Sequence, residues 1–399
     1  MKLRLNKTVA AVASGALLLM VVPAVGLAST AGAKSKPSYT IGYEGPLSGA
    51  NVQLGLNMVF GVELAINNAN ATHKLPFALK LKTYDTQGSG TLSPAQAQAA
   101  VANKNVAAMV GPSFSGETKA AEPYYSAADM ATVSPSATAA ALAFGKKNNF
   151  MRVIAGDDVQ GAADANYLVK TKSLKTLIVV DDGSFYGAGL ASVVAKSAAS
   201  DGATVTPYTY PESGSCGGTA SVSQYAAAAT QIVADKAGGL FYGGYYCDFG
   251  LLLGALSSAG YKGTIMSGDG SWTSALITGT SPGTAANNVL LSEAGGGNSN
   301  LTGKLAKQYQ ALAHFTSNNA TYAAQAYDAT NVVIAALQKV KHVSNLKKFR
   351  ESIVTELHKM TFKGVTGTIK FQGNGDLTRS SVVDFGQIQS GAIVSIGHS

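Results

Sequence analysis

The chain has 399 residues, of which 46% are hydrophobic and only 13% charged, and its formal net charge is +8. Typical soluble domains have about 25% charged residues, but this hydrophobic share still allows a substantial core, so the composition does not indicate disorder. Without the three basic residues of the predicted export signal described next, 27 basic residues face 22 acidic ones, a net charge of +5. Such a small excess indicates no nucleic-acid partner.

Residues 1–33 are predicted to be a cleaved export signal. Three basic residues, Lys2, Arg4 and Lys7, precede a mostly apolar run, and Ala31-Gly-Ala33 has the small side chains of a cleavage site. The alternative is a single membrane anchor, because the run approaches the ~20 residues that span a bilayer. Since the segment contains no cysteine, a lipid-anchored cysteine is not expected. The mature protein is expected to be exported, either periplasmic or extracellular.

From Ser38 onward, short β-branched runs alternate with longer alanine-rich helical patterns. Strands are predicted at 39–43, 78–84, 106–110, 130–133, 150–154, 177–180, 203–209, 239–242 and 264–267. Helices are predicted at 51–68, 94–103, 117–129, 186–200, 219–236, 249–259, 302–316, 322–340 and 344–359, and another runs to Lys172 from an N-cap at Asp157 or Asp158. This alternation predicts parallel sheets covered by helices. So many units exceed one sheet and predict two α/β lobes.

Tyrosines and one aspartate follow the ends of predicted strands in the second half of the chain. Tyr245 and Tyr246 follow strand 239–242, and Asp269 follows strand 264–267. Ligands of open α/β sheets bind outside the carboxyl ends of the strands, so these residues predict a pocket for an apolar group and an ammonium. Tyr186 opens a helix at another strand end and is expected in the same wall. The alternatives are a turn-forming role for Asp269 and core packing for Tyr186.

Two loops in the first half of the chain offer donors for an anion. Ser115 lies between strand 106–110 and the following helix, where backbone N–H groups favour negative charge. Ser136, Ala137 and Thr138 follow the next strand. Helix N-capping is the alternative for each loop alone. A carboxylate site, a cation site and tyrosine walls together fit a zwitterionic α-amino acid.

Signals of catalysis, cofactors and metals are weak. The chain has no Gly-x-Ser-x-Gly, Gly-Lys-Ser/Thr or His-Glu-x-x-His motif, and its five histidines are scattered. We therefore expect no enzyme activity, no cofactor and no metal site. The two cysteines, Cys216 and Cys247, are predicted to form a disulfide in an oxidising compartment, with two buried thiols as the alternative.

Several motifs, taken in order, resemble the leucine/isoleucine/valine-binding proteins of branched-chain amino acid ABC transporters. They are Gly45-Pro-Leu-Ser-Gly49, Val110-Gly-Pro112, Ser134-Pro-Ser-Ala-Thr138, Gln160-Gly161, Tyr186-Gly-Ala-Gly189, Tyr242-Gly-Gly-Tyr-Tyr246 and Tyr327-Asp328-Ala329. The resemblance implies the type I periplasmic binding fold, α/β, with two Rossmann-like lobes joined by three hinge crossings near Asp157, Ser292 and Gly373. The lobes would comprise 38–156 plus 293–373 and 157–292 plus 374–399.

The resemblance also implies a role for each candidate residue. Ser115 and the loop of Ser136, Ala137 and Thr138 would hold the ligand carboxylate, and Asp269 would take the ammonium. Tyr186 and Tyr245 would line the cleft from the second lobe. The implied protein is a monomer that captures a branched-chain or aliphatic amino acid by lobe closure and delivers it to a membrane permease.

One departure from the family leaves the ligand open. Leu54 stands where a leucine-binding member has an aromatic residue. Binding of an amide, a urea-like solute or an aromatic acid, or a role as a sensory module, are therefore the alternatives. Trp272, the only tryptophan, is expected at the cleft edge.

Overall fold

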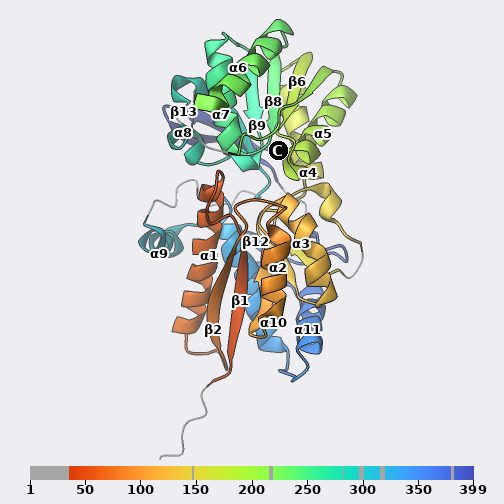
Figure 1. Ribbon diagram of the computed structural model, residues 1–399, viewed down its shortest axis with the longest axis vertical. Coiled ribbons are helices and arrows are strands. Elements are labelled where there is room, and N and C mark those ends of the chain that lie inside the picture. The colour runs from red at the N-terminus through yellow and green to blue at the C-terminus, as the bar shows by residue number, and fades with distance from the viewer. Residues whose placement is uncertain are drawn as a thin grey trace, which may run out of the picture. The chain divides into compact units, whose positions relative to one another are not determined.

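A computed structural model of the protein describes residues 36–145, 148–214, 219–280, 282–295, 301–314, 320–378 and 382–399, without the side chains of 219–224. The predicted signal, residues 1–33, lies outside the described residues. Residues 37–399 form one compact unit. Within this unit, two sheets build two lobes, one containing β1 and β2 and the other β6, β8 and β9 (Figure 1).

The sheet of the first lobe has five parallel strands in the order β2-β1-β3-β4-β5. The strands are β1 (Ser38–Gly45), β2 (Ala78–Asp85), β3 (Val106–Val110), β4 (Thr132–Ser134) and β5 (Phe150–Arg152). β3, with the sequence Val-Ala-Ala-Met-Val, is buried along its whole length, as expected for a parallel strand that is covered on both faces. Parallel pairing confirms the predicted α/β class for this lobe.

Helices from two distant parts of the chain cover this sheet. They are α1 (Val52–Ala71), α2 (Ser93–Ala102), α3 (Ser115–Ala127), α9 (Gly303–Ala313), α10 (Ala323–Lys339) and α11 (Leu346–Lys359). α1 packs against α10 at Gly61, where a Cβ would lie 2.5 Å from the Ala323 carbonyl oxygen. Only glycine allows this approach, which brings the residues before α10 close to the other strand ends. A short hairpin, β11 (Phe362–Gly364) and β12 (Gly367–Ile369), follows α11.

The sheet of the second lobe has the order β14-β13-β10-β9-β8-β6-β7. Five strands are parallel: β6 (Thr176–Asp181), β7 (Thr204–Thr209), β8 (Gly239–Gly243), β9 (Thr264–Ser267) and β10 (Leu290–Glu293). The last two, β13 (Asp384–Gln389) and β14 (Ala392–His398), are antiparallel. The helices are α4 (Asp157–Asn166), α5 (Phe185–Ser200), α6 (Thr219–Ala234), α7 (Tyr246–Ser258) and α8 (Ala275–Thr278). The carboxyl ends of β6, β8 and β9 carry the predicted tyrosines and aspartate.

The chain changes sheet after β5, after β10 and before β13, which agrees with the three crossings implied by the family resemblance. The finer lobe boundaries stay a prediction. Glu293, placed in the first lobe by that prediction, pairs with Asp384 in the second sheet. Arg152 Nε donates to Asp376 Oδ1 at 2.6 Å, so the turn around residues 372–376 is fastened to β5.

Two local predictions need correction. The N-cap of α4 is Gly156, and both Asp157 and Asp158 lie in the first helical turn. The helix predicted at 249–259 begins at Tyr246, because Tyr245 is extended and forms its N-cap. The carboxyl group of Asp157 therefore lies at the start of α4, and the hydroxyl-bearing side chain of Tyr246 lies at the start of α7. Both helix starts face the carboxyl ends of the strands. Among the described helices, none is both long and apolar enough to cross a membrane.

Candidate ligand-binding site

Asp269 lies at the carboxyl end of β9, in a short 3-10 turn, and is fully buried. Its Oδ1 accepts a hydrogen bond from the Tyr186 hydroxyl at 2.5 Å, and its Oδ2 accepts one from the Tyr322 hydroxyl at 2.8 Å. Burial raises the pKa of Asp269, and the hydrogen bonds from Tyr186, Tyr322 and Gln160 oppose that rise. Since Tyr322 precedes α10 of the first lobe, both lobes hold this carboxylate.

Three aromatic rings extend from Asp269 across to the first lobe. The rings of Tyr186 and Tyr245 lie 5.1 Å apart, and Tyr245 stacks on Phe114 at 4.4 Å. Phe114 directly precedes α3 and Ser115. A second contact between the lobes is the hydrogen bond from the Tyr246 hydroxyl to the Ala50 carbonyl oxygen at 3.0 Å. The structure thus brings Tyr186, Tyr245 and Asp269 together, as the sequence predicts.

The four predicted residues in the loops of the first lobe differ from one another in their hydrogen bonds. Ser136 Oγ donates to the Ser113 carbonyl oxygen at 2.6 Å, and the Ala137 N–H donates to Ser134 Oγ at 3.0 Å. Both groups therefore hold the loop in place. Ser115 Oγ accepts from the Ala139 N–H at 3.2 Å and keeps its own hydrogen available. Thr138 Oγ1 has no hydrogen-bond partner although the residue is fully buried.

Asp157, which the sequence analysis assigned to helix capping and to a hinge crossing, also lies beside the first-lobe loop. Its backbone N–H donates to the Thr138 carbonyl oxygen at 2.8 Å, which fixes the start of α4 beside the first-lobe loop. The side chain is fully buried, and neither carboxylate oxygen has a well-formed hydrogen bond, although the Thr138 hydroxyl interacts with the carboxyl group. Burial raises the pKa of Asp157 to about 8, the charge of Asp269 adds to the rise, and Thr138 and Arg152 oppose it.

Further along α4, a polar network supports this pair of aspartates. Gln160 Nε2 donates to Ser292 Oγ at 3.0 Å, and Ser292 Oγ donates to Asp164 Oδ2 at 3.0 Å. Gln160 Oε1 and Asp164 Oδ1 are buried without a partner. Burial also raises the pKa of Asp164. Several buried acceptors near Asp269 thus lack a donor among the described residues, which is the environment that a ligand ammonium would satisfy.

Arg152 is the buried cation of this region, and its bonds point to the first-lobe loop. Its Nη1 donates to the carbonyl oxygens of Ala137 and Ala139, at 3.2 and 3.0 Å, while Nε is paired with Asp376. The guanidinium therefore holds the backbone of the loop that carries Thr138.

Two other sequence predictions concern the surroundings of the site. Leu54 is fully buried in α1. Trp272 is 8% exposed, and its ring faces Gly386 of β13, while its carbonyl oxygen accepts a hydrogen bond from the Thr321 hydroxyl just before α10. Trp272 therefore contacts β13 of the second-lobe sheet and Thr321, which precedes α10 of the first lobe. Cys247 is buried in α7, and Cys216 lies outside the described residues, so their disulfide stays a prediction.

Outward from the stacked pair Phe114 and Tyr245 lies a cavity of about 470 Å³, called here the outer cavity. Its walls come from loops at strand ends of both lobes. The lining residues are Gly49, Ala50, Asn51, Gln87, Gly88, Ser89, Gly90, Thr91, Phe114, Gly116, Ser184, Phe185, Glu212, Gly214, Tyr245 and Asp248.

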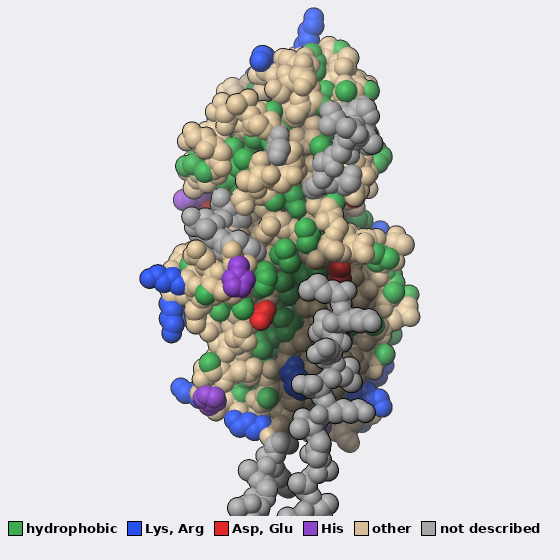
Figure 2. All heavy atoms as spheres, turned by 60° about the vertical axis from the view of Figure 1, so that its left-hand side comes forward, with side chains coloured by type: hydrophobic (Ala, Val, Ile, Leu, Met, Phe, Trp, Pro, Cys, Tyr) green, Lys and Arg blue, Asp and Glu red, His purple; other side chains and the backbone are tan. Residues whose placement is uncertain are grey.

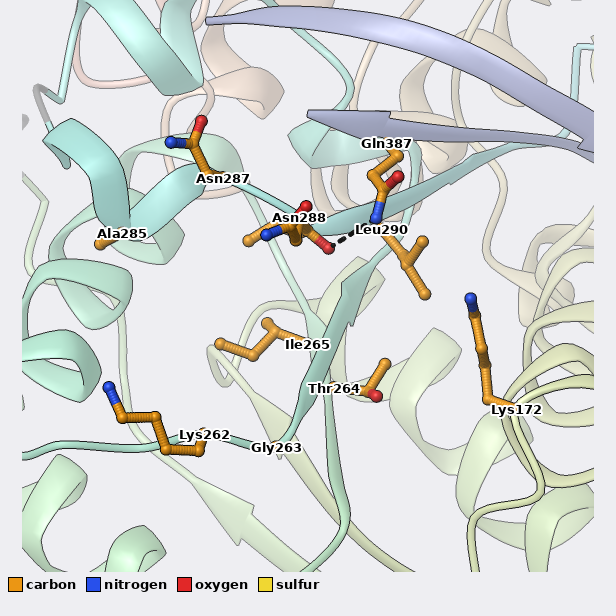
Figure 3. A pocket seen from close by; sticks show the side chains of 11 residues that line it. Lys172, Lys262, Gly263, Thr264, Ile265, Ala285, Asn287, Asn288, Leu290 and Gln387 are labelled. Carbon is orange, nitrogen blue, oxygen red and sulfur yellow. Dashed lines mark hydrogen bonds between the residues drawn. The ribbon is translucent and has the colours of Figure 1, made fainter. Parts of the chain in front are cut away.

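A separate hollow of about 270 Å³ lies at the opposite end of β9 and β10, where Thr264 and Leu290 begin these strands (Figure 3). Lys172 and Lys262 stand on its two sides in that view. This hollow is distant in the fold from the carboxyl ends of the strands. On the face shown in Figure 2, basic side chains are scattered around the periphery and form no single patch. No group of metal-binding side chains is found in the described ranges.

Comparison with known proteins identifies relatives over nearly the whole chain from residue 38 onward. Residues 38–392 match the family described as periplasmic binding protein. A leucine-, isoleucine-, valine-, threonine- and alanine-binding protein of Pseudomonas aeruginosa is 26% identical over 352 residues, covering 84% of this chain and 86% of the relative. A Leu/Ile/Val-binding protein homologue of Brucella melitensis is 26% identical and covers 95% of this chain and 99% of its own.

Solved structures show the same fold. A leucine-binding protein of Thermotoga maritima has a TM-score of 0.77 and 23% identity, covering 90% of this chain and 98% of its own. A branched-chain amino acid transporter binding protein of Streptococcus pneumoniae, solved with isoleucine, has a TM-score of 0.75, 22% identity and coverage of 90% and 99%. The family resemblance inferred from the motifs is thereby confirmed, and the family is one of substrate-binding proteins. This chain belongs to the periplasmic binding protein family.

Proposed function

We propose that this protein captures an α-amino acid with an aliphatic side chain between its two lobes and delivers it to an ABC transporter permease. The ligand carboxylate accepts hydrogen bonds from the first-lobe loops, with Ser115 and Thr138 as hydroxyl donors. The ligand ammonium lies against Asp269 and Asp157. Ser136 and Ala137 hold the loop in the shape that this contact requires.

The observation that carries the proposal is the unpartnered carboxylate of Asp157 beside that of Asp269. An ionised, fully buried carboxylate without a well-formed hydrogen bond is costly, so Asp157 holds a proton in the free protein and would ionise when a ligand supplies a cation. The backbone N–H of Asp157 is bonded to the Thr138 carbonyl oxygen, so the acidic end of the site adjoins the hydroxyl end. A molecule with an ammonium next to a carboxylate satisfies both ends at once.

Lobe closure is the proposed mechanism of capture. The contacts from Tyr322 to Asp269, from Tyr246 to Ala50 and from Phe114 to Tyr245 join the two lobes. Opening would break these contacts, and the ligand would add further contacts to both sides. A ligand that prefers the closed form shifts the population toward it, and the permease would then recognise that form.

The remaining parts of the proposal concern processing and assembly. The family supports an exported, periplasmic protein, and the basic start and apolar run of residues 1–33 support a cleaved signal. A disulfide between Cys216 and Cys247 would fasten the loop after β7 to the start of α7. A monomer is the proposed state.

The buried carboxylates also separate this proposal from its alternatives. An aromatic acid would bring a second negative charge toward Asp157 and Asp269, with no ammonium to balance it. An amide or a urea-like solute would leave the two carboxylates without a cation. A sensory role would use the same ligand and differs only in the partner.

The test is calorimetric titration of the refolded mature protein with leucine, isoleucine and valine, with Trp272 fluorescence as a second readout. Saturable binding is expected, and Asp269→Asn should weaken it by about 100-fold, since a charged hydrogen-bonded contact is worth roughly 1.5–3 kcal/mol. The matched control is Asp201→Asn on the surface of the second lobe, which should bind like the wild type. Binding of benzoate or acetamide in place of the amino acids would overturn the proposal.

A further inference from the structure

The outer cavity contains a group of acidic side chains that the amino acid site does not use. Glu212 and Asp248 line it, and Asp182 interacts with both. Asp182 and Asp248 are each only 1% exposed, whereas Glu212 is exposed at the wall. The Glu212 N–H donates to the Asp182 carbonyl oxygen at 3.0 Å, and the two carboxyl groups lie within hydrogen-bonding reach of each other. Three carboxyl groups are therefore gathered at one side of the cavity.

The backbone fixes two of these carboxylates firmly. Asp182 accepts from the N–H groups of Ser184 at 2.9 Å and Tyr245 at 3.1 Å. Asp248 Oδ1 accepts from the Ser213 N–H and from the Tyr225 hydroxyl, both at 2.8 Å. These bonds hold the acids in place, and each donor is neutral. Burial raises the pKa of Glu212 to about 8 and that of Asp182 to about 6, so these two carboxyl groups share a proton near neutral pH. A cationic group of a ligand would take the place of that proton.

A second, independent feature on the opposite wall points to the same kind of ligand. Asn51, at the N-cap of α1 in the first lobe, lines the outer cavity and is 92% buried, with 8% of its surface exposed. Its side-chain oxygen has no hydrogen-bond partner. A buried acceptor without a donor is costly, so this oxygen also calls for an N–H or O–H group from a ligand.

The described residues that line the outer cavity include no lysine or arginine. The ammonium of Lys119 lies 4.2 Å from the centroid of the Phe185 ring, so it is near the rim and interacts with that ring. The three acids are also not arranged as a metal site among the residues that the structure describes. An organic cation with several N–H donors fits the acceptors of both walls.

We propose that the outer cavity receives the cationic end of a ligand side chain, an ammonium or a guanidinium, between Glu212 and Asp248 of one lobe and Asn51 of the other. This inference rests on the proposed function, because the α-amino and α-carboxyl groups of the ligand would occupy the site of Asp269 and Ser115. Tyr245 and Phe114 form the wall shared by the two compartments. The protein then accepts basic amino acids in addition to aliphatic ones.

Two matched pairs of ligands isolate the cationic end: lysine against norleucine, and arginine against citrulline. Each pair has a similar chain length and differs in the terminal charge. At low ionic strength, the cationic member of at least one pair should bind about fivefold or more tightly, since even an exposed ion pair contributes up to about 1 kcal/mol. The preference should shrink at high salt.

Glu212→Gln removes the exposed acid and leaves the buried ones in place. It should abolish the preference within the pair and leave the affinity for leucine unchanged, whereas Asp235→Asn, an exposed acid at the far end of α6, should preserve the preference. Equal affinity within both pairs in the wild-type protein, with leucine still bound, would overturn this inference alone. Failure of every amino acid to bind would overturn both it and the proposed function.

Discussion

Two of the regions that bury carboxyl groups treat them in opposite ways. In the first lobe, Glu44 accepts hydrogen bonds from Ser93 Oγ at 2.5 Å and from the Tyr125 hydroxyl, and Glu117 accepts from the Phe114 N–H at 2.7 Å and from Thr86. At the hinge side of the second lobe, Asp157 has no partner for either oxygen.

Burial raises the pKa in both regions, to about 8 for Glu44, about 7 for Glu117 and about 8 for Asp157. A raised pKa therefore does not separate a structural carboxyl group from a binding one. The two kinds differ in whether the fold supplies hydrogen-bond donors to the carboxyl oxygens. Glu44 and Glu117 are satisfied within the fold, whereas Asp157 is left for a group that the protein does not contain.

The largest expected effect comes from removing a satisfied carboxyl group. Glu44→Ala strands the Tyr125 hydroxyl in the core, leaves Ser93 Oγ with only the Glu117 carbonyl oxygen as acceptor, and should lower the free energy of unfolding by about 2–4 kcal/mol. Urea denaturation followed by circular dichroism measures this change. Because Glu44 is in the first-lobe core, the folded fraction should still bind leucine with unchanged affinity. A loss of affinity without a loss of stability would remove the distinction between the two regions.

A smaller effect, of the opposite kind, is expected at the unsatisfied carboxyl group. Asp157→Asn should weaken leucine binding by roughly 10- to 100-fold, because a charge-assisted contact to the ammonium is lost. The free protein should be no less stable than the wild type, since no hydrogen bond is removed. Calorimetric titration and thermal melting measure the two quantities. The control is Asp158→Asn, the exposed neighbour in the same helical turn, which should change neither.

The effect of pH on stability is the smallest of the three when it is taken per pH unit. The carboxyl of Asp157 is protonated in the free folded protein up to about pH 8, whereas an unfolded aspartate loses its proton near pH 4. Between these values the folded state holds more protons, so the stability of the free protein should fall as pH rises, by at most about 1.4 kcal/mol per pH unit for one proton.

Glu44 and Glu117 contribute to the same decline, so the informative quantity is a difference between variants. Asp157→Asn should flatten the dependence of the melting temperature on pH between pH 5 and 8 relative to the wild type. Identical slopes would mean that Asp157 is already ionised in the free protein, and the account of the unsatisfied carboxyl group would need revision.

Much of the fold is predictable from the sequence because it depends on local patterns. Apolar runs such as Val106–Val110 give the strands almost to the residue, and the strand-end rule places Tyr186, Tyr245 and Asp269 next to one another. Glycine and proline mark most of the turns. These signals lie within a few residues of the feature that they predict.

The unpredicted parts depend on distant segments. Asp157 follows a glycine at the start of a helix, which is a common capping pattern, and only the fold shows that its carboxylate has no local partner. Tyr322 reaches Asp269 across 53 residues of sequence, from the first lobe. Ser136 was predicted as a ligand donor, but the Ser113 carbonyl oxygen, brought close by the neighbouring strand, takes its hydrogen bond.

The central claim is that the cleft binds a zwitterion, with its ammonium at Asp269 and Asp157 and its carboxylate at the first-lobe loops. The most direct measurement is calorimetric titration with leucine, with 4-methylpentanoate, which lacks the ammonium, and with 3-methylbutylamine, which lacks the carboxylate. Leucine should bind, and each analogue should bind about 100-fold more weakly or not at all. Binding of 4-methylpentanoate as tightly as leucine would contradict the claim.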